Sequence, residues 1–348
     1  MKAVRKMDHG IGFVSCVDIP EPQIVRPNDV KIKVEYCGIC GTDDHIVNHG
    51  LEPPKAPLPV PVTLGHEYSG TVVEVGPEVT GIKVGDRVTT GGLTGFCGRC
   101  LLCIGGFIGG CATAKSIGYE CDGAMAEYIV HEESYMFKLP DNMSFEAGAL
   151  IEPAAVACHA VFERAKITPT DVVMVMGAGP IGLLVMQFAK LTGATVGIVD
   201  VSAASGKLEL AKKLGADFVF ENDKMDVTST VLQMTGGRGV NVTFDCTSNP
   251  KCIDQAILMT GFNGQVMLVG TPPADGYKLD RMLISFMKEQ TLQNAFAHNV
   301  FTWPKAINLI ATGRIQVEPL VSHKFKFDDC EEAFSLKDPT KIKILMHP

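Results

Sequence analysis

Four cysteines, Cys97, Cys100, Cys103 and Cys111, lie within fifteen residues in the segment CGRCLLCIGGFIGGC. Thiolates joined by loops this short can bind a tetrahedral Zn²⁺ ion with sulfur at all four coordination positions. Because no position then remains for a substrate, such an ion stabilises the local fold and takes no part in a reaction. The spacing therefore predicts a structural zinc lobe over about residues 95–113.

A second set of candidate metal ligands is spread over three segments. Cys40 lies in YCGICGTDDH, His66 and Glu67 in LGHEYSG, and Glu152 in IEPAAVACHA. A catalytic zinc ion is held by about three protein ligands, and its fourth position is open to substrate. Cys37 competes with Cys40 because the two form a CxxC pair, and spacing alone does not decide between them.

A glycine-rich turn, GAGPIG, lies between an apolar segment that predicts a strand and an amphipathic segment that predicts a helix. Glycines at such a turn let the backbone approach a pyrophosphate, which binds at the helix N-terminus. The sequence thus predicts a dinucleotide site. Its expected cofactor-binding residues are Gly177, Gly179, Pro180, Ile181 and Gly182.

The type of dinucleotide is indicated by Asp200, which ends the next predicted strand. A carboxylate there accepts hydrogen bonds from the adenosine ribose and repels a 2′-phosphate, which favours NAD over NADP. Lys207 is a nearby cation with a minor expected role at the ribose. Thr247, Val269 and Gly270 follow later strands, and we expect them on the nicotinamide side because ligands bind at the carboxyl ends of parallel strands.

These residues have to be positioned by two kinds of architecture. Residues 1–152 contain short β-branched runs between Gly and Pro, which predict a barrel-like antiparallel catalytic domain. Strands and helices then alternate over residues 153–291, which predicts a doubly wound parallel sheet that binds the cofactor. A C-terminal segment, residues 292–348, carries one predicted helix and two strands. We expect it to return to the first domain, although periodicity alone does not decide this. The predicted fold class is therefore α/β with two domains.

Bulk composition excludes several classes of partner. The net charge of −8 argues against nucleic acid or an anionic membrane surface, because both require a basic patch. No apolar run is long enough to span a membrane, and the first residues lack the apolar core of a signal peptide. Clustered cysteines in a long chain favour reduced thiols, and hence a cytoplasmic location.

The chain resembles the zinc-containing medium-chain dehydrogenases, in the branch of the sorbitol, butanediol and threonine dehydrogenases. The motifs that carry this resemblance run nearly from end to end: GICGTD, GHEYSGTVVEVG, KVGDRV, CGRCLLC, EPAAVACHA, GAGPIG and AINLIATGRI. The resemblance implies a GroES-like catalytic domain, a Rossmann domain, one catalytic and one structural Zn²⁺, NAD, and a homo-oligomer (dimer or tetramer).

The resemblance also assigns roles. It makes Cys40 the catalytic ligand and Cys37 a bystander, with His66 as the second ligand. Whether Glu67 or Glu152 binds the ion directly stays open. Thr42 would take the proton of the alcohol and His45 would pass it to solvent. Phe96, directly before the lobe, is expected to face the substrate.

The expected activity is hydride transfer between NAD(H) and a secondary alcohol or polyol and its ketone. Two alternatives come from different classes. GTDDHIV resembles the pattern of L-threonine 3-dehydrogenases. A zinc-ribbon protein without catalysis would bind nucleic acid through the lobe, but Arg99 and Lys115 supply too little charge for phosphate contacts.

Overall fold

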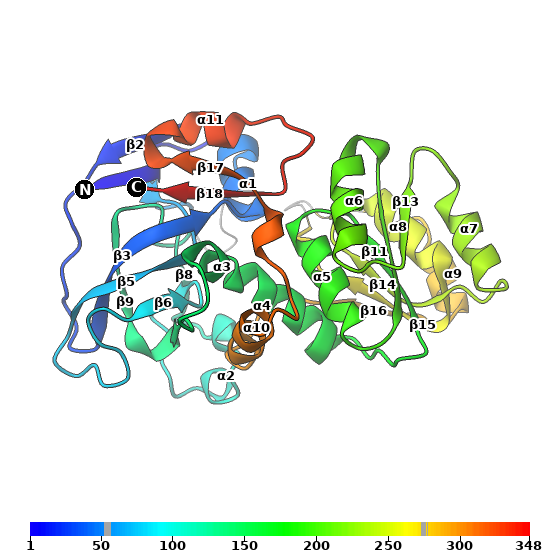
Figure 1. The fold of residues 1–348 in the computed structure, drawn as a ribbon, viewed down its shortest axis with the longest axis horizontal. Helices are drawn as coiled ribbons and strands as arrows, with labels where there is room; N and C mark the ends of the chain where they lie inside the picture. The colour runs from blue at the N-terminus through cyan, green and yellow to red at the C-terminus, as the bar shows by residue number, and fades with distance from the viewer. Residues whose placement is uncertain (52–56, 273–275, 277) are drawn as a thin grey trace. The chain divides into compact units, whose positions relative to one another are not determined.

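The structure is a computed structural model that describes residues 1–51, 57–272, 276 and 278–348 (Figure 1). The chain forms two compact units. The first comprises Met1–Glu152, Asn299–Gly313 and Val317–Pro348, and the second comprises Pro153–His298 and Arg314–Gln316. The expected α/β class with two sheet-containing units is confirmed.

The first unit is built on a β-sheet whose strands β3 and β5 lead to or carry candidate metal ligands. In spatial order its strands are β10 (Met136–Lys138), β6 (Arg87–Thr90), β5 (Glu67–Val75), β3 (Asp29–Gly38), β18 (Lys343–His347) and β17 (Val321–Lys326), and β9 (Tyr128–Glu132) pairs with β3. Strand β3 has partners along both edges and is largely buried, as its β-branched sequence favours.

Smaller elements complete this unit. Strands β2 (Val14–Asp18), β1 (Lys2–Lys6) and β4 (Val62–Thr63) form one short sheet, and β7 (Leu93–Thr94) pairs with β8 (Lys115–Ser116). The helices are α1 (Gly41–His49), α2 (Leu101–Ile104), α3 (Phe145–Ala149), α10 (Thr302–Ala311) and α11 (Cys330–Ser335), while α4 (Ile151–His159) begins at the end of this unit.

The two C-terminal strands belong to the first sheet. Strand β18 pairs antiparallel with β3, with Leu345 opposite Gly38 and Met346 opposite Cys37. Strand β17 pairs parallel to β18, so this edge of the sheet departs from the antiparallel arrangement expected for the domain. The pairing brings the C-terminal segment next to β3, which leads directly to Cys40.

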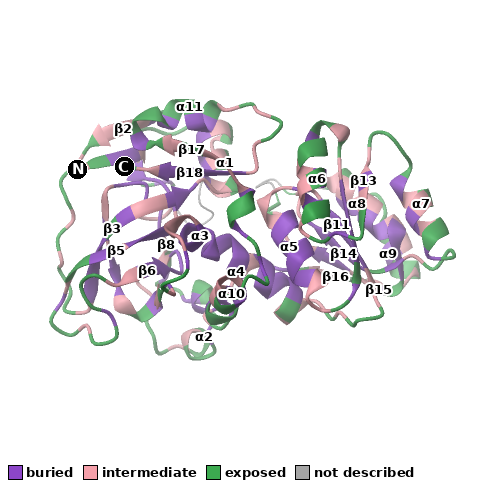
Figure 2. Cartoon of the chain, in the orientation of Figure 1, coloured by how far each residue is buried: buried purple, intermediate pink, exposed green. Residues whose placement is uncertain are grey.

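The second unit is a parallel sheet with the order expected of a doubly wound fold. Its strands lie in the order β13 (Phe218–Glu221), β12 (Thr195–Asp200), β11 (Val172–Met176), β14 (Val240–Asp245), β15 (Thr260–Leu268) and β16 (Thr291–Asn294). The connecting helices are α5 (Pro180–Lys190), α6 (Ser205–Lys213), α7 (Val227–Met234), α8 (Pro250–Met259) and α9 (Met282–Met287). Figure 2 shows the central strands β11 and β14 as buried.

Two local features depend on tertiary structure. The apolar run at residues 145–165 is divided into α3, α4 and a π-helical turn at Ala160–Arg164, because Leu150 leaves the helical backbone between α3 and α4. Strand β16 has no apolar alternation in the sequence, and its pairing with β15 extends the second unit to His298 rather than to residue 291. Across the described ranges, every helix is too short or too polar to cross a bilayer.

Candidate active site

Cys40, His66 and Glu67 form a compact group of possible metal ligands in the first unit. One ligand atom from each residue lies within 4.8 Å of the others. Cys40 is the N-cap of α1, Glu67 is the first residue of β5 and His66 directly precedes it, so two separate segments build the group. Cys37, the alternative to Cys40, is fully buried and is not a member of this group.

Asp43 fixes the backbone on both sides of this group. Its carboxylate accepts hydrogen bonds from the backbone N–H groups of Cys40 (2.9 Å) and Gly65 (3.2 Å). The side chain is completely buried, and burial raises its pKa while the charge of His66 opposes this. Asp43 therefore links the two ligand-bearing segments, a role that sequence reasoning missed although the residue lies in GTDDH.

Two glycines make room for the ligands. A Cβ atom at Gly38 would lie 2.3 Å from the Glu67 carboxylate oxygen. Gly65 has a φ of +91°, and a Cβ atom there would lie 2.6 Å from the Cys37 sulfur. Both positions thus require glycine, because any side chain would displace the residues beside the metal ligands.

Glu67 has a buried counterion that the sequence did not reveal. The Lys343 ammonium group donates to the two oxygens of Glu67 at 2.9 and 2.7 Å, and to the Ile39 carbonyl oxygen at 2.9 Å. Burial disfavours the charged lysine, but the Glu67 carboxylate outweighs it and raises the pKa of Lys343. Burial also raises the pKa of Glu67, yet both of its oxygens accept hydrogen bonds from the ammonium group, so we assign the pair as charged.

Glu152 lies on the edge of this electrostatic group. It is buried, and its charge acts on His66, Glu67 and Lys343. It is not among the residues whose ligand atoms lie within 4.8 Å of one another. Burial tends to lower the pKa of His66, but the charge of Cys40, supported by the nearby carboxylates, raises it well above its ordinary value. The imidazole thus lies in a strongly negative environment that suits a cation.

Thr42 and His45 follow Cys40 along α1. Thr42 is half-buried in the first turn, whereas His45 is exposed one turn later, with its ring edge-on to His49 at a centroid distance of 5.3 Å. The helix therefore leads from the ligand group toward solvent.

The four cysteines of the predicted lobe come together in space. The Cys100 and Cys103 sulfurs are 3.5 Å apart, and those of Cys97 and Cys103 are 4.0 Å apart. Four sulfurs about 2.3 Å from a tetrahedral zinc ion would be separated by about 3.8 Å. The group includes Cys111, and its four sulfurs all lie within 4.8 Å of one another, which is compatible with one tetrahedral zinc ion.

Backbone groups in the lobe stabilise thiolates. The N–H groups of Arg99 and Cys100 lower the pKa of Cys97, and the N–H group of Cys97 contributes most to lowering the pKa of Cys111 to about 5. Burial and a hydrogen bond to Cys100 raise the pKa of Cys103 to about 12. A divalent cation among the sulfurs would stabilise the remaining thiolates.

The glycine turn of the second unit has the geometry of a phosphate-binding loop. Gly177 follows β11 with a φ of +93°, Gly179 is the N-cap of α5, and Pro180 is its first residue. A Cβ atom at Gly182 would lie 1.9 Å from the Gly177 carbonyl oxygen, and no neighbouring atom lies within 4 Å of a Cβ at Gly179. The turn is thus closed on its inner side and open at the helix N-terminus, next to Ile181.

Asp200 stands beside this turn at the end of β12. Its two carboxylate oxygens accept the N–H groups of Ala178 and Val201, each at 2.7 Å. Lys207 is half-buried on α6, in the segment that follows.

Thr247 follows β14 directly across from the turn. A Cβ atom at Gly177 would lie 2.8 Å from the Thr247 methyl group, and the Thr247 hydroxyl donates to Asp245 at 2.6 Å. Val269 and Gly270 follow β15 and donate their N–H groups to the Asp245 carbonyl oxygen. The sheet order reverses between β11 and β14, which is where doubly wound sheets bind dinucleotides.

Comparison with known proteins identifies the family. A model of the alcohol dehydrogenase GroES-like domain matches residues 26–141, and a model of zinc-binding dehydrogenases matches residues 180–312. The chain belongs to the zinc-binding dehydrogenase family. The resemblance inferred from the sequence motifs is therefore confirmed, and the protein is a zinc-dependent oxidoreductase that transfers hydride between a nicotinamide cofactor and an alcohol.

Individual relatives are similar over nearly their whole length. D-arabitol-phosphate dehydrogenase of Enterococcus avium is 34% identical over 99% of this chain and 97% of its own. Sorbitol dehydrogenase of Halalkalibacterium halodurans is 33% identical over 100% of this chain and 99% of its own. The crystal structure of 2R,3R-butanediol dehydrogenase from Bacillus subtilis has a TM-score of 0.88 and 35% identity, covering 100% of this chain and 99% of its own.

Proposed function

We propose that this dehydrogenase oxidises a secondary hydroxyl group of a polyol or diol to a ketone with NAD, and catalyses the reverse reduction. The observation that carries the proposal is the compact group of Cys40, His66 and Glu67, whose ligand atoms lie within 4.8 Å of one another. The named activities of the similar proteins support the substrate class, since they act on sorbitol, butanediol and an arabitol phosphate.

We assign Cys40 and His66 as ligands of the catalytic zinc, with Glu67 or Glu152 as the third. A zinc ion bound there would act as a Lewis acid that lowers the pKa of the substrate hydroxyl. Asp43 holds the Cys40 and Gly65 backbones, and Lys343 neutralises Glu67. The four cysteines of the lobe are assigned to the structural zinc, where no position is left for substrate.

The proton of the hydroxyl has to leave a buried site. In the proposed path the Thr42 hydroxyl accepts it, and His45, whose ring is exposed, releases it to solvent. Helix α1 carries both residues and Cys40, its N-cap.

The proposal is tested by NAD reduction across secondary alcohols, sugar alcohols, sugar-alcohol phosphates and L-threonine. We expect the highest kcat/KM with a vicinal diol or polyol. A clear preference for L-threonine would instead support the threonine dehydrogenase alternative, which the GTDDH motif suggests. Tight zinc binding without reduction of NAD by any of these compounds would leave the non-catalytic zinc-ribbon alternative.

A specific prediction concerns Asp200 in the assigned NAD site. Replacing Asp200→Ala removes a charged acceptor from the Ala178 N–H group and, in the proposed complex, from the ribose. Hydrogen bonds to charged groups contribute about 1.5–3 kcal/mol, so we expect the KM for NAD to rise about 10- to 100-fold. Steady-state kinetics with varied NAD and NADP measure this.

Asp217→Ala is the matched control for this variant. Asp217 accepts hydrogen bonds from Lys190 (2.6 Å) and from the Val196 N–H group (2.7 Å), at the opposite end of β12 from Asp200. We expect its KM for NAD to equal that of the wild type. If both variants behave alike, Asp200 has no special role in cofactor binding.

The homo-oligomer implied by the family is proposed to form through the edge of the second sheet. Strand β16 pairs only with β15 among the described strands, so its other edge is available to the same strand of a second copy. Helix α9, which precedes it, exposes Leu283 (70%), Phe286 (81%) and Met287 (68%). Phe286→Glu should shift the molecular mass measured by light scattering toward the monomer, and an unchanged mass would exclude this surface.

A reducing, cytoplasmic environment is proposed for the enzyme. None of the twelve cysteines forms a disulfide, and Cys37 and Cys330 lie in the interior. Metal binding by Cys40 and by the lobe requires unoxidised sulfur.

A further inference from the structure

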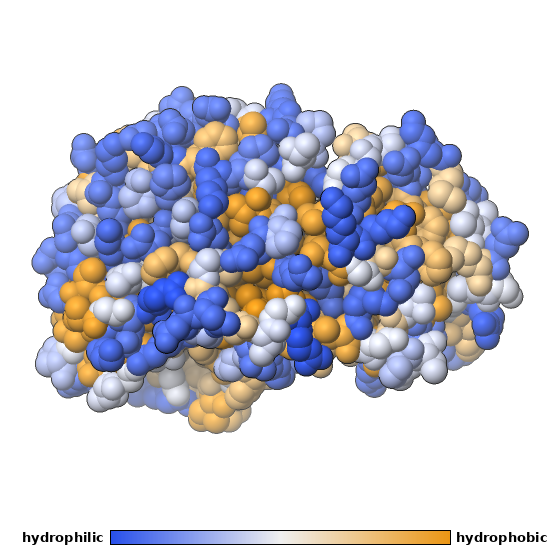
Figure 3. Space-filling model, in the orientation of Figure 1, coloured by the Kyte–Doolittle hydropathy of each residue, from blue (hydrophilic) through white to orange (hydrophobic). Residues whose placement is uncertain are grey.

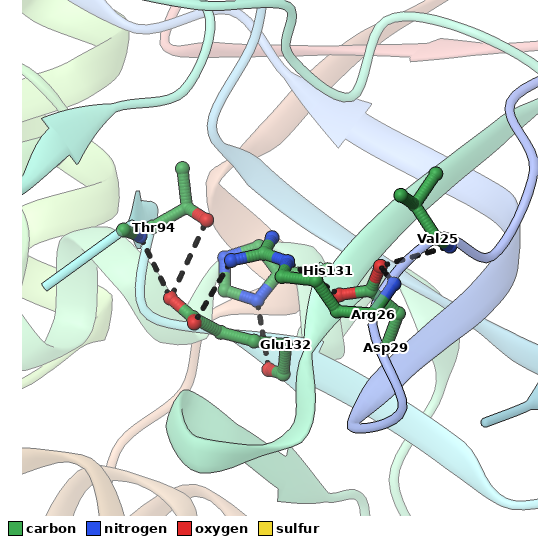
Figure 4. Close-up of polar contacts among 7 residues, drawn as sticks. Val25, Arg26, Asp29, Thr94, His131 and Glu132 are labelled. Carbon is green, nitrogen blue, oxygen red and sulfur yellow. Dashed lines mark hydrogen bonds and ion pairs between the residues drawn. The ribbon is translucent and has the colours of Figure 1, made fainter. Parts of the chain in front are cut away.

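Glu132 lies beside the segment that leads into the cysteine lobe of the first unit. It is the last residue of β9 and is 7% exposed. One of its carboxylate oxygens accepts the Gly95 N–H group at 2.8 Å and the Thr94 hydroxyl at 3.4 Å (Figure 4). Thr94 ends β7, and Cys97 follows two residues after Gly95. The carboxylate therefore holds the backbone at Gly95, two residues before Cys97, the first cysteine of the lobe.

The other oxygen of Glu132 contacts Arg26, which also pairs with Asp29. It lies 3.4 Å from the Arg26 guanidinium, which forms an ion pair with Asp29 at 3.1 Å (Figure 4). Asp29 in turn accepts the backbone N–H groups of Arg26 (2.8 Å) and Val25 (3.2 Å). Because buried carboxylates are costly unless they are paired, this arrangement holds Glu132 in one orientation.

His131, the neighbour of Glu132, does not compete for this carboxylate. Its Nδ1 atom is 3.0 Å from the Glu132 carbonyl oxygen (Figure 4), and its Nε2 atom has no hydrogen-bond partner in the part of the chain that the structure describes. Burial lowers the pKa of His131, so its ring is neutral. The donors to the carboxylate are thus those from Thr94, Gly95 and Arg26.

Ile108 is the buried apolar side chain within the lobe, whereas several of its other large apolar side chains are exposed. Leu101 (87%), Ile104 (70%) and Phe107 (52%) are exposed, and Figure 3 shows apolar surface at the place of α2. Strands β7 and β8 pair over only two residues each. Besides Ile108 and the hydrogen bond from the Val300 N–H group to the Gly106 carbonyl oxygen, the order of the lobe therefore depends on its metal and on its attachment at Gly95.

Phe96 connects the attachment to the interior of the unit. It lies between Gly95 and Cys97, and its ring packs edge-on against Tyr135 with a centroid distance of 6.1 Å. The charge of Glu152 acts on the phenol of the buried Tyr135. A shift at Gly95 would thus move the Phe96 ring. That ring contacts Tyr135, on which the charge of the candidate catalytic residue Glu152 acts.

We propose that Glu132 is a positioning residue: it anchors the cysteine lobe through Gly95, so that the lobe retains its zinc and Phe96 keeps its place against Tyr135. The inference rests on the proposed zinc occupancy of the four cysteines. Outer partners of metal sites commonly change metal affinity about 10- to 100-fold, and we expect a change of this order in the rate of metal loss.

The test compares Glu132→Gln with the wild-type enzyme. In protein with cobalt in the lobe and zinc in the catalytic site, the four thiolates give a sulfur-to-cobalt charge-transfer band, and its decay after addition of a chelator reports metal loss from the lobe alone. We expect decay about 10-fold faster in the variant. We also expect a raised KM for the alcohol with an unchanged KM for NAD, a split that general destabilisation would not produce.

Glu133→Gln is the matched control. Glu133 also accepts backbone N–H groups, but those of Gly81 (2.5 Å) and Ile82 (3.1 Å) in a turn away from the lobe. In the Glu133→Gln variant the cobalt band should decay at the same rate as in the wild type. If the cobalt band decays at the same rate in folded Glu132→Gln, Glu133→Gln and the wild type, Glu132 does not anchor the lobe, while the assignment of the structural zinc still stands. A wild type without the thiolate band would instead contradict the structural zinc itself.

Discussion

Replacing Cys40→Ala or His66→Ala should lower kcat/KM for the alcohol by at least about 1,000-fold, since a metal Lewis acid contributes several kcal/mol to such reactions. Both residues belong to the compact ligand group in the first unit. The cofactor residues lie in the second unit, so NAD binding should persist. Steady-state kinetics, metal analysis and NAD titration by fluorescence measure these effects, and the zinc content should fall from two ions to one per chain.

Cys37→Ala distinguishes loss of a ligand from loss of a thiol. Cys37 is buried three residues before Cys40 but lies outside the ligand group. This variant should keep both zinc ions and most of the activity, with a modest loss of stability. If Cys37→Ala lost one zinc ion while Cys40→Ala kept both, the assignment of the two cysteines would have to be exchanged.

The second large effect is expected on stability, from Lys343→Met. The substitution leaves Glu67, which is 1% exposed, without the ammonium group that donates to both of its oxygens. Breaking a buried ion pair by removing one partner costs about 3–5 kcal/mol. The free energy of unfolding of the zinc-loaded enzyme, measured in urea, should fall by that amount.

Two further variants separate the buried charge from the loss of a lysine. Lys324→Met breaks an exposed pair with Glu146 (2.8 Å) and should cost no more than about 1 kcal/mol. Adding Glu67→Gln to Lys343→Met should recover part of the lost free energy of unfolding, because the double variant no longer buries an unpaired carboxylate. A Lys343→Met variant as stable as Lys324→Met would show that Glu67 does not depend on Lys343.

The extent to which the fold followed from the sequence differs between the two units. In the second unit strands such as β11 and β12 are short apolar runs bordered by turn residues, and connections to the next parallel strand are local and right-handed. The predicted strands around Gly177 and Asp200 therefore correspond to β11 and β12. In contrast, β16 has no apolar alternation and exists because its backbone pairs with β15.

The candidate ligands show the same contrast. Cys97, Cys100 and Cys103 are neighbours along the chain, and the turns between them bring the Cys103 sulfur within 3.5 Å of that of Cys100 and 4.0 Å of that of Cys97. Cys40 and His66 are joined only when α1 and β5 fold together through Asp43. Spacing alone consequently left Cys37 and Cys40 as equal alternatives.

The amino-acid sequence by itself determined the cysteine lobe, the GAGPIG turn and the acidic residue that ends the next strand, because each depends on backbone geometry over a few residues. The tertiary structure alone decided that Lys343 neutralises Glu67, 276 residues away in sequence, and that Glu132 holds Gly95. Such pairs arise from strand order and burial, where an unpaired charge would be too costly, and no local pattern encodes that partnership.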